Sequence, residues 1–224
     1  MKHLYFRVAA LLLAVATIVA CGSRERKAGK LISDYFYKTL YDFESYQPVE
    51  TTVDSMFISP VFDTKCRDAA LLGLEAHNLY KKAQDDVDEA VSTMQIWSGG
   101  WDSYSRNRFN EAREKADNSL KEASRQLRAY YEQQLAIKEI ANGLGNEFAG
   151  WYVTHTYRCK SKGGMALLSK DVFLIDPKCK EVIFHFDTED PEEAELQEFI
   201  FDSVICSADS LKSFIERLDD IKKK

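Results

Sequence analysis

Two long stretches of the chain repeat their hydrophobic residues at steps of three and four. They run from about Thr64 to Ile96 and from about Ser105 to Ala141, and this period is that of an amphipathic α-helix. Only a short segment, Ser98-Gly99-Gly100-Trp101-Asp102, separates them. Because so short a connection folds helices back on each other, we predict an antiparallel helical hairpin. Alanines on the predicted seam would let the two helices approach closely.

The residues before the hairpin predict a helix followed by an extended segment. Apolar positions keep the helical period over about 27–43, and this helix is expected to end before Tyr46-Gln47-Pro48, since the residue preceding a proline avoids helical backbone. Residues Gln47–Ser55 then alternate between apolar and polar side chains. We predict that this segment is extended, closes near Pro60 and packs along the side of the first long helix.

After the hairpin the pattern changes to the period of two that is typical of β-strands. Strands are predicted over Phe148–Cys159, Met165–Ile175 and Glu181–Phe186, with turn sequences between them. Such short turns connect antiparallel neighbours, so the three strands form a meander. One face of the first strand carries Trp151, Val153, His155, Tyr157 and Cys159.

The C-terminal part is predicted to be helical again. Asp190-Pro191 supplies an N-cap acid and a proline at the first helical position, and this helix is expected to run toward Phe199–Val204. We interpret the acidic cluster Glu189–Glu195 as this cap rather than as a metal site. An alternative is a fourth strand over Phe199–Ile205. A last amphipathic helix begins after Ser207.

The first twenty residues have the composition of a signal peptide. Lys2 and Arg7 form a basic start, and the apolar run that follows is shorter than the ~20 residues that a spanning helix needs. The run ends in Ile18-Val19-Ala20-Cys21, which resembles the bacterial lipobox. This resemblance implies cleavage between Ala20 and Cys21 and attachment of acyl chains to Cys21, which would anchor the mature protein in a membrane.

The residues after the cysteine predict which membrane holds the anchor. Gly22 differs from the aspartate that lipoproteins of the inner membrane often carry, so the resemblance implies the outer membrane. Surface-exported lipoproteins of Bacteroidota often have an acidic run at this point, whereas Ser23–Lys27 is mostly basic. We therefore expect the periplasmic face of the outer membrane.

These elements predict an α+β fold, with a long antiparallel helical hairpin, a small antiparallel β-meander and a C-terminal helix. The predicted division is a signal peptide at 1–20; an anchor, N-terminal helix and extended segment at 21–63; the hairpin at 64–142; and the meander with the C-terminal helices at 146–224. We expect the last part to pack with the hairpin as one domain.

The net charge of the chain argues against one class of partner, nucleic acid. The chain has 30 basic and 36 acidic residues and a formal net charge of −6. The leader holds two of the basic residues and none of the acidic ones, so its removal leaves a mature chain of net charge −8. Phosphate backbones require basic surfaces, so nucleic acid is not an expected partner.

The mature chain has few residues or motifs that indicate catalysis or ligand binding. His77 lies on the predicted hairpin, and His155 and His185 lie on the first and third strands of the meander, where a strand separates them. No HxH, HExxH or acidic-partner spacing supports a ligand or metal site at the two strand histidines, and the sequence has no nucleophile or phosphate-binding motif. We therefore expect structural histidines, no catalytic residue, no metal and no cofactor.

Four cysteines remain besides Cys21, namely Cys66, Cys159, Cys179 and Cys206. In an exported protein they could form two disulfides in any of three pairings, or they could stay free as small buried side chains. Cys159 and Cys179 are expected at opposite ends of a strand pair, which makes their pairing the least favoured.

Three aromatic residues, Trp97, Trp101 and Tyr104, flank the turn of the predicted hairpin. Exposed aromatic rings there could stack on a glycan or insert into a partner protein. The alternative is that the three rings cap the end of the hairpin core.

The lipobox, the segment Tyr46–Ser55, the helical hairpin and the strand Gly150–Arg158 are together similar to uncharacterised envelope lipoproteins of Bacteroidota. This resemblance implies no particular biochemical activity, because none is assigned to that group of lipoproteins. We expect a lipid-anchored envelope protein that acts as a non-catalytic binding or assembly component, with a protein or glycan partner. The alternatives are a hydrolase of envelope polymers and a hairpin that self-associates. A cleft with converging carboxylates or a His–carboxylate pair would indicate the enzyme.

Overall fold

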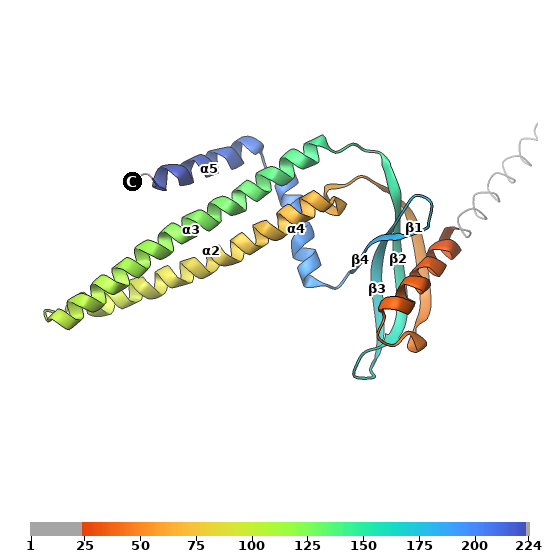
Figure 1. The fold of residues 1–224 in the computed structure, drawn as a ribbon, viewed down its shortest axis with the longest axis horizontal. Coiled ribbons are helices and arrows are strands. Elements are labelled where there is room, and N and C mark those ends of the chain that lie inside the picture. Colours follow the sequence, from red (N-terminus) through yellow and green to blue (C-terminus); the bar gives the residue numbers. More distant parts are fainter. Residues whose placement is uncertain (1–23, 223–224) are drawn as a thin grey trace, which may run out of the picture. The chain divides into compact units, whose positions relative to one another are not determined.

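The computed structural model describes residues 24–222 and combines helices with one antiparallel sheet, in agreement with the predicted α+β class (Figure 1). The chain divides into two compact units. The sheet unit comprises the chain up to Ile58 together with Gly145–Ala194, and the hairpin unit comprises Ser59–Leu144 together with Glu195–Lys224. Cys21 and Ala20, the residues of the expected anchor and cleavage point, lie outside the described residues.

The sheet unit contains four antiparallel strands in the order β1-β2-β3-β4. Strands β2 (Phe148–Lys160), β3 (Ala166–Ile175) and β4 (Val182–Asp187) are the predicted meander, which is confirmed. Strand β1 (Gln47–Phe57) pairs with β2 along its length. The prediction that this segment packs along the first long helix was therefore wrong, because its unpaired backbone groups find their hydrogen-bond partners on β2.

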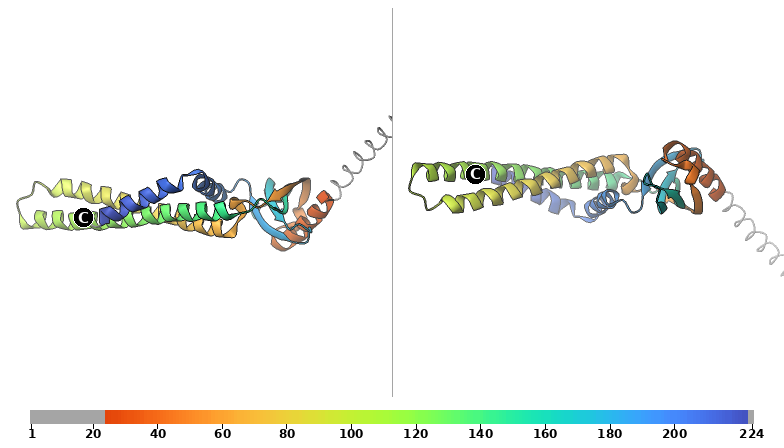
Figure 2. Two further views of the ribbon diagram at one scale, coloured as in Figure 1. Left: turned by 90° about the horizontal axis from the view of Figure 1, so that it is seen from above. Right: turned by 90° about the horizontal axis from the view of Figure 1, so that it is seen from below.

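A helix over residues 24–39 covers one face of this sheet (Figures 1 and 2). It ends earlier than predicted, and a 3-10 turn, η1 (Phe43–Ser45), leads into β1. The face that it covers is the predicted apolar face of β2, now extended by residues of β3. The buried residues of this core are Ala28, Ile32, Phe36, Val153, Tyr157, Cys159, Phe173 and Ile175.

Gly150 in β2 has no room for a side chain. Its φ is +150°, and a Cβ atom there would lie 2.2 Å from the carbonyl oxygen of Ile175. Because that oxygen belongs to the backbone of the neighbouring strand, the sheet itself would have to move.

Gly150→Ala is therefore expected to lower the free energy of unfolding by about 3 kcal/mol. Urea denaturation followed by the fluorescence of Trp151, in a parent in which Trp97 and Trp101 are replaced by Phe, measures this loss. Gly163→Ala is the matched control in the sheet unit, since a Cβ on Gly163 meets only Oγ of Ser161, at an ordinary contact of 3.7 Å, and it should leave the denaturation midpoint unchanged. Equal midpoints for the Gly150 variant and the parent protein would contradict the close approach.

The hairpin unit is built on two long antiparallel helices, α2 (Thr64–Trp97) and α3 (Ser103–Gly143), which confirms the predicted hairpin. Aspartates cap both helices: Asp63 accepts a hydrogen bond from the backbone N–H of Cys66, and Asp102 accepts one from that of Ser105. The seam is lined by small buried side chains, as expected for closely packed helices: Ala69, Ala70, Ala76, Ala83, Ala90, Ala112, Ala116 and Ala123.

Two further helices follow, α4 (Pro191–Ile205) and α5 (Ala208–Lys222). The alternative of a fourth strand over Phe199–Ile205 is wrong, because these residues are helical and Phe199 packs onto α2 where Gly73 leaves space for its ring. Asp190 accepts a hydrogen bond from the backbone N–H of Glu192, as expected of the predicted cap. Helix α5 lies beside α3, where Phe214 stacks on Tyr131 (Figure 2).

Within residues 24–222, no helix combines the length and the apolar character needed to cross a membrane.

Candidate functional site

A polar network is enclosed in the core of the sheet unit. His155 on β2 and Asp171 on β3 face each other as register partners, with exposed fractions of 0 % and 3 %. The hydroxyl of Tyr157 donates a hydrogen bond of 3.0 Å to Oδ2 of Asp171, and Nε2 of His185 on β4 lies 2.7 Å from the same oxygen. The buried carboxylate of Asp171 thus has one hydrogen-bond partner on β2 and one on β4, in agreement with the rule that buried charges are paired.

His155 is held neutral by its surroundings. Burial lowers its pKa from the ordinary 6.5 to about 4, against a smaller opposing influence of Asp171. Its Nε2 lies 2.8 Å from the hydroxyl of Tyr46, and its Nδ1 lies 2.8 Å from that of Thr51. Burial also raises the pKa of Tyr46 to about 12, so this hydroxyl keeps its proton. Both ring nitrogens of His155 therefore bond within the core.

The buried His155 makes stability depend on pH. Its pKa is lower in the folded than in the unfolded chain, so the unfolded chain binds the additional proton as the pH falls from 6.5 toward 4. Stability is therefore complete above pH 6.5 and is lost below it. We expect a loss from this residue of about 2 kcal/mol between pH 7 and pH 5.

Urea denaturation of the parent protein and of His155→Gln at both pH values measures this contribution. Carboxylates titrate in both proteins, so the informative quantity is the difference between the two unfolding free energies. This difference should shrink as the pH falls, and a difference that stays constant from pH 7 to pH 5 would contradict a neutral, buried His155.

His185 is also engaged at both ring nitrogens. Its Nε2 contacts Asp171, its Nδ1 lies 3.4 Å from the hydroxyl of Tyr35 on the N-terminal helix, and its ring stacks on Phe173 at 4.4 Å. General acid–base catalysis needs a nitrogen within reach of the substrate. In this structure both ring nitrogens of His185 contact groups of the protein itself, and His185 with Asp171 is a His–carboxylate pair of the kind expected of an enzyme.

The sequence motifs did not reveal the pairing of an acid with a strand histidine. Strand β3 does separate β2 from β4, as expected, but Asp171 on that intervening strand reaches His185. The signal was present in the sequence: Asp171 alternates with the apolar Phe173 and Ile175, and an acid on the inner face of a strand requires a partner. Oδ1 of Asp171 is buried without a hydrogen-bond partner, and the structure offers no account of it.

The third histidine, His77, lies half-buried on α2, with its ring 5.1 Å from that of Tyr130. Burial lowers its pKa, and its Nδ1 has no partner. His77 belongs to the hairpin unit, whereas His155, Asp171 and His185 belong to the sheet unit.

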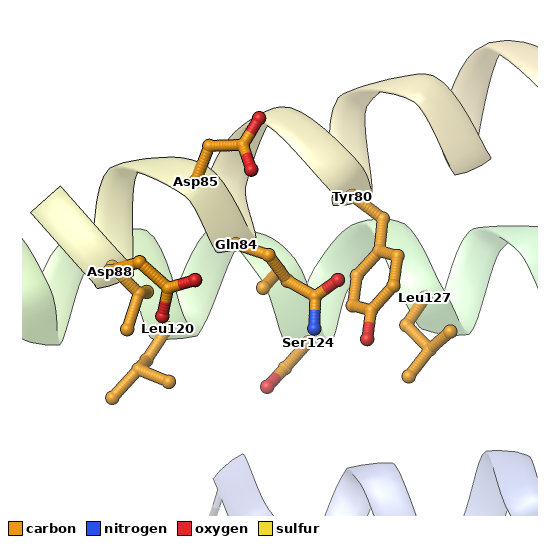
Figure 3. A pocket seen from close by; sticks show the side chains of 9 residues that line it. Tyr80, Gln84, Asp85, Asp88, Leu120, Ser124 and Leu127 are labelled. Carbon is orange, nitrogen blue, oxygen red and sulfur yellow. The ribbon is translucent and has the colours of Figure 1, made fainter.

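The hairpin unit carries an open groove of about 380 Å³ between α2 and α3 (Figure 3). Tyr80, Leu120, Ser124 and Leu127 point to the same side of the helix pair. Leu120 keeps 52 % of its surface exposed. The remaining lining residues are Gln84, Asp85, Val87, Asp88 and Ala123.

The structure separates the three aromatic residues of the hairpin turn. The rings of Trp97 and Tyr104 meet edge to face at 5.5 Å, whereas Trp101 is 95 % exposed. Trp101 therefore does not cap the hairpin core, and only Trp97 and Tyr104 pack together. A small hollow of about 180 Å³ beside Trp97 also includes Arg106 and Phe109.

The four described cysteines are free thiols, and burial raises the pKa values of Cys66, Cys159 and Cys179. Cys159 lies near the β2–β3 turn and Cys179 in the β3–β4 turn, at opposite ends of the strands as predicted. Within the part of the chain that the structure describes, no cluster of three histidine, cysteine or acidic side chains could hold a metal ion.

Comparisons of this chain with protein-family models, with curated proteins and with solved structures found no match.

Proposed function

We propose that this protein is a lipid-anchored component of the bacterial cell envelope that binds a partner protein and performs no catalysis. Cys21 would carry the anchor in the outer membrane, on its periplasmic face, as the lipobox resemblance implies. The observation that carries the proposal is the open groove between α2 and α3, lined by the half-exposed Leu120.

The polar network supports this proposal against the hydrolase alternative. Both ring nitrogens of His155 and of His185 are occupied by groups of the protein itself, and Asp171 is buried. A hydrolase would need a nitrogen or carboxylate presented to its substrate. This network instead ties the N-terminal helix, β1, β2, β3 and β4 to one another.

The groove has the chemistry of a site for an amphipathic helix. Its apolar side chains, Val87, Leu120 and Leu127, lie at spacings suited to an inserted helix face, and Asp85 and Asp88 supply acidic charge at its edge. The partner segment would therefore be apolar on one face and basic at its flanks, since complementary charge steers association.

A second copy of the chain is the runner-up partner. From Gln84 to Trp97, α2 has four acidic residues and no basic one, whereas Ser103–Leu120 of α3 has four basic and three acidic residues. The excess of acid on α2 favours pairing with basic side chains of a second hairpin. Size-exclusion chromatography of the purified protein separates the two partners, because only self-association persists in the absence of other envelope proteins.

The test is the size of the complex extracted in mild detergent from the envelope. Leu120→Asp places a charge in the groove and should shift the protein from a complex to the size of the free chain. Asn118→Asp is the matched control, because it lies two residues away on α3, about 200° around the helix, and it should keep the complex. A complex that survives Leu120→Asp, or no complex in the parent protein, would overturn the proposal.

A further inference from the structure

We propose that the sheet unit binds anionic phospholipid headgroups through a basic surface formed by the start of the N-terminal helix and the β3–β4 turn. This inference rests on the proposed lipid anchor, because it assigns the surface that would lie against the membrane. We call it the basic surface and define it by Arg24, Lys27, Lys178 and Lys180, all of which are exposed.

Contacts within the sheet unit bring the two parts of the basic surface together. The guanidinium of Arg24 lies 4.5 Å from the ring centroid of Trp151, and the indole N–H of Trp151 donates a hydrogen bond of 3.1 Å to the carbonyl oxygen of Pro177 in the turn. Burial raises the pKa of the Cys179 thiol. The positive charges of Lys27 and Arg24 act on this thiol in the opposite direction, so both side chains lie near the turn. The turn and the first helical turn therefore share one end of the sheet (Figure 1).

The acidic residues at this end are fewer than the basic ones. Asp176 turns its carboxylate into the turn, where it accepts hydrogen bonds from the backbone N–H groups of Lys178, Lys180 and Glu181. Glu25 and Glu181 are the other acids nearby. Against these stand the four residues of the basic surface, with Arg26 and Lys30 adjacent on the helix. An excess of positive charge is unusual in a chain of net charge −6.

The position of the basic surface along the chain matches the expected anchor. Arg24 follows Cys21 by three residues, a span of at most about 11 Å for an extended chain. The headgroups that surround the acyl chains would therefore lie within reach of Arg24 and Lys27. Each basic residue near an anionic leaflet contributes about 1 kcal/mol, or about fivefold in affinity.

The acyl chains and the basic surface would have different roles in membrane binding. The acyl chains would retain the protein, and the basic surface would fix which end of the sheet unit meets the headgroups. A lipid anchor alone leaves that orientation free, because the acyl chains contact only the hydrocarbon region.

The test uses the mature chain from Gly22 to Lys224 without acyl groups, so that binding depends on the folded protein alone. Sedimentation with vesicles of phosphatidylethanolamine and phosphatidylglycerol should pull the protein down, and sedimentation with phosphatidylcholine vesicles should not. The variant Lys178→Glu/Lys180→Glu should weaken binding at least about tenfold, since it reverses two charges. Its matched control is Lys81→Glu/Lys82→Glu on α2, an exposed adjacent pair that should bind like the parent.

Three results would overturn the inference: equal binding to both kinds of vesicle, equal loss in the variant and in its control, and displacement by inorganic phosphate beyond that by chloride at the same ionic strength. The last would identify a site for free phosphate. None of these results depends on Cys21, so failure here is distinct from failure of the anchor, which appears as release of the Cys21→Ala protein from membranes.

Discussion

Cells that make the Cys21→Ala protein are expected to lose it from the membrane fraction. The lipobox resemblance implies that the sulfur of Cys21 accepts the acyl group, and alanine at this position would leave no sulfur to modify. Each buried methylene of an acyl chain contributes about 0.8 kcal/mol, and two or three chains give a stable anchor.

The measurement is immunoblotting of membranes washed at high salt, which removes protein held only by the basic surface. Cys206→Ala is the matched control, since Cys206 is a free thiol on the hairpin unit and its loss should leave the protein in the membrane fraction. Mature-sized Cys21→Ala protein that still resists the wash would rule out lipidation at this residue.

Phe173→Ala is expected to destabilise the sheet unit more than any surface change. Phe173 is fully buried, and its ring meets those of Phe36 at 5.4 Å, Tyr35 at 5.8 Å and His185 at 4.4 Å. Truncation of such a residue leaves a cavity and typically costs about 3–5 kcal/mol, a large part of the ~5–15 kcal/mol that stabilises a domain. The N-terminal helix would lose its main support on β3.

Urea denaturation followed by the fluorescence of Trp151, in a parent in which Trp97 and Trp101 are replaced by Phe, reports on this unit. The matched control is Leu168→Ala on the same strand, where the side chain is 62 % exposed and its truncation should change stability little. If the two variants unfold at the same urea concentration, the helix over residues 24–39 does not depend on Phe173 for its packing.

The helices were predictable because their signals are local and long. Helix α2 begins at the predicted Thr64, and α3 extends the predicted range by two residues at each end. Over more than thirty residues, a helical period of apolar side chains has no competing interpretation. The meander was predictable for a similar reason, since short turns restrict each strand to pairing with the next.

Strand β1 was not predictable because its partner is far away in sequence. Its residues alternate as a strand should, but Thr51 pairs with His155, and the whole hairpin separates the two in the chain. Alternation indicates which face is buried and does not indicate the partner strand. The same limit concealed the His155 environment, since Tyr46 and Thr51 both come from this distant segment.

The groove was not predictable because it depends on how two helices are aligned. Leu120 and Leu127 are seven residues apart on α3 and were part of the expected apolar stripe, so they would normally be buried. The structure leaves Leu120 half exposed, because the alanines of the seam occupy the contact between α2 and α3. The sequence pattern identifies the apolar stripe of α3. Only the packing of α2 against α3 shows which residues of that stripe remain exposed.

Photo-crosslinking in living cells tests the proposed binding function most directly. A photoreactive amino acid in place of Leu120 should form a discrete adduct with one envelope protein or with a second copy of the chain, while the same amino acid in place of Asn118 should form none. Absence of an adduct from position 120, or equal adducts from both positions, would contradict the claim that this protein works by binding a partner in the groove of its hairpin.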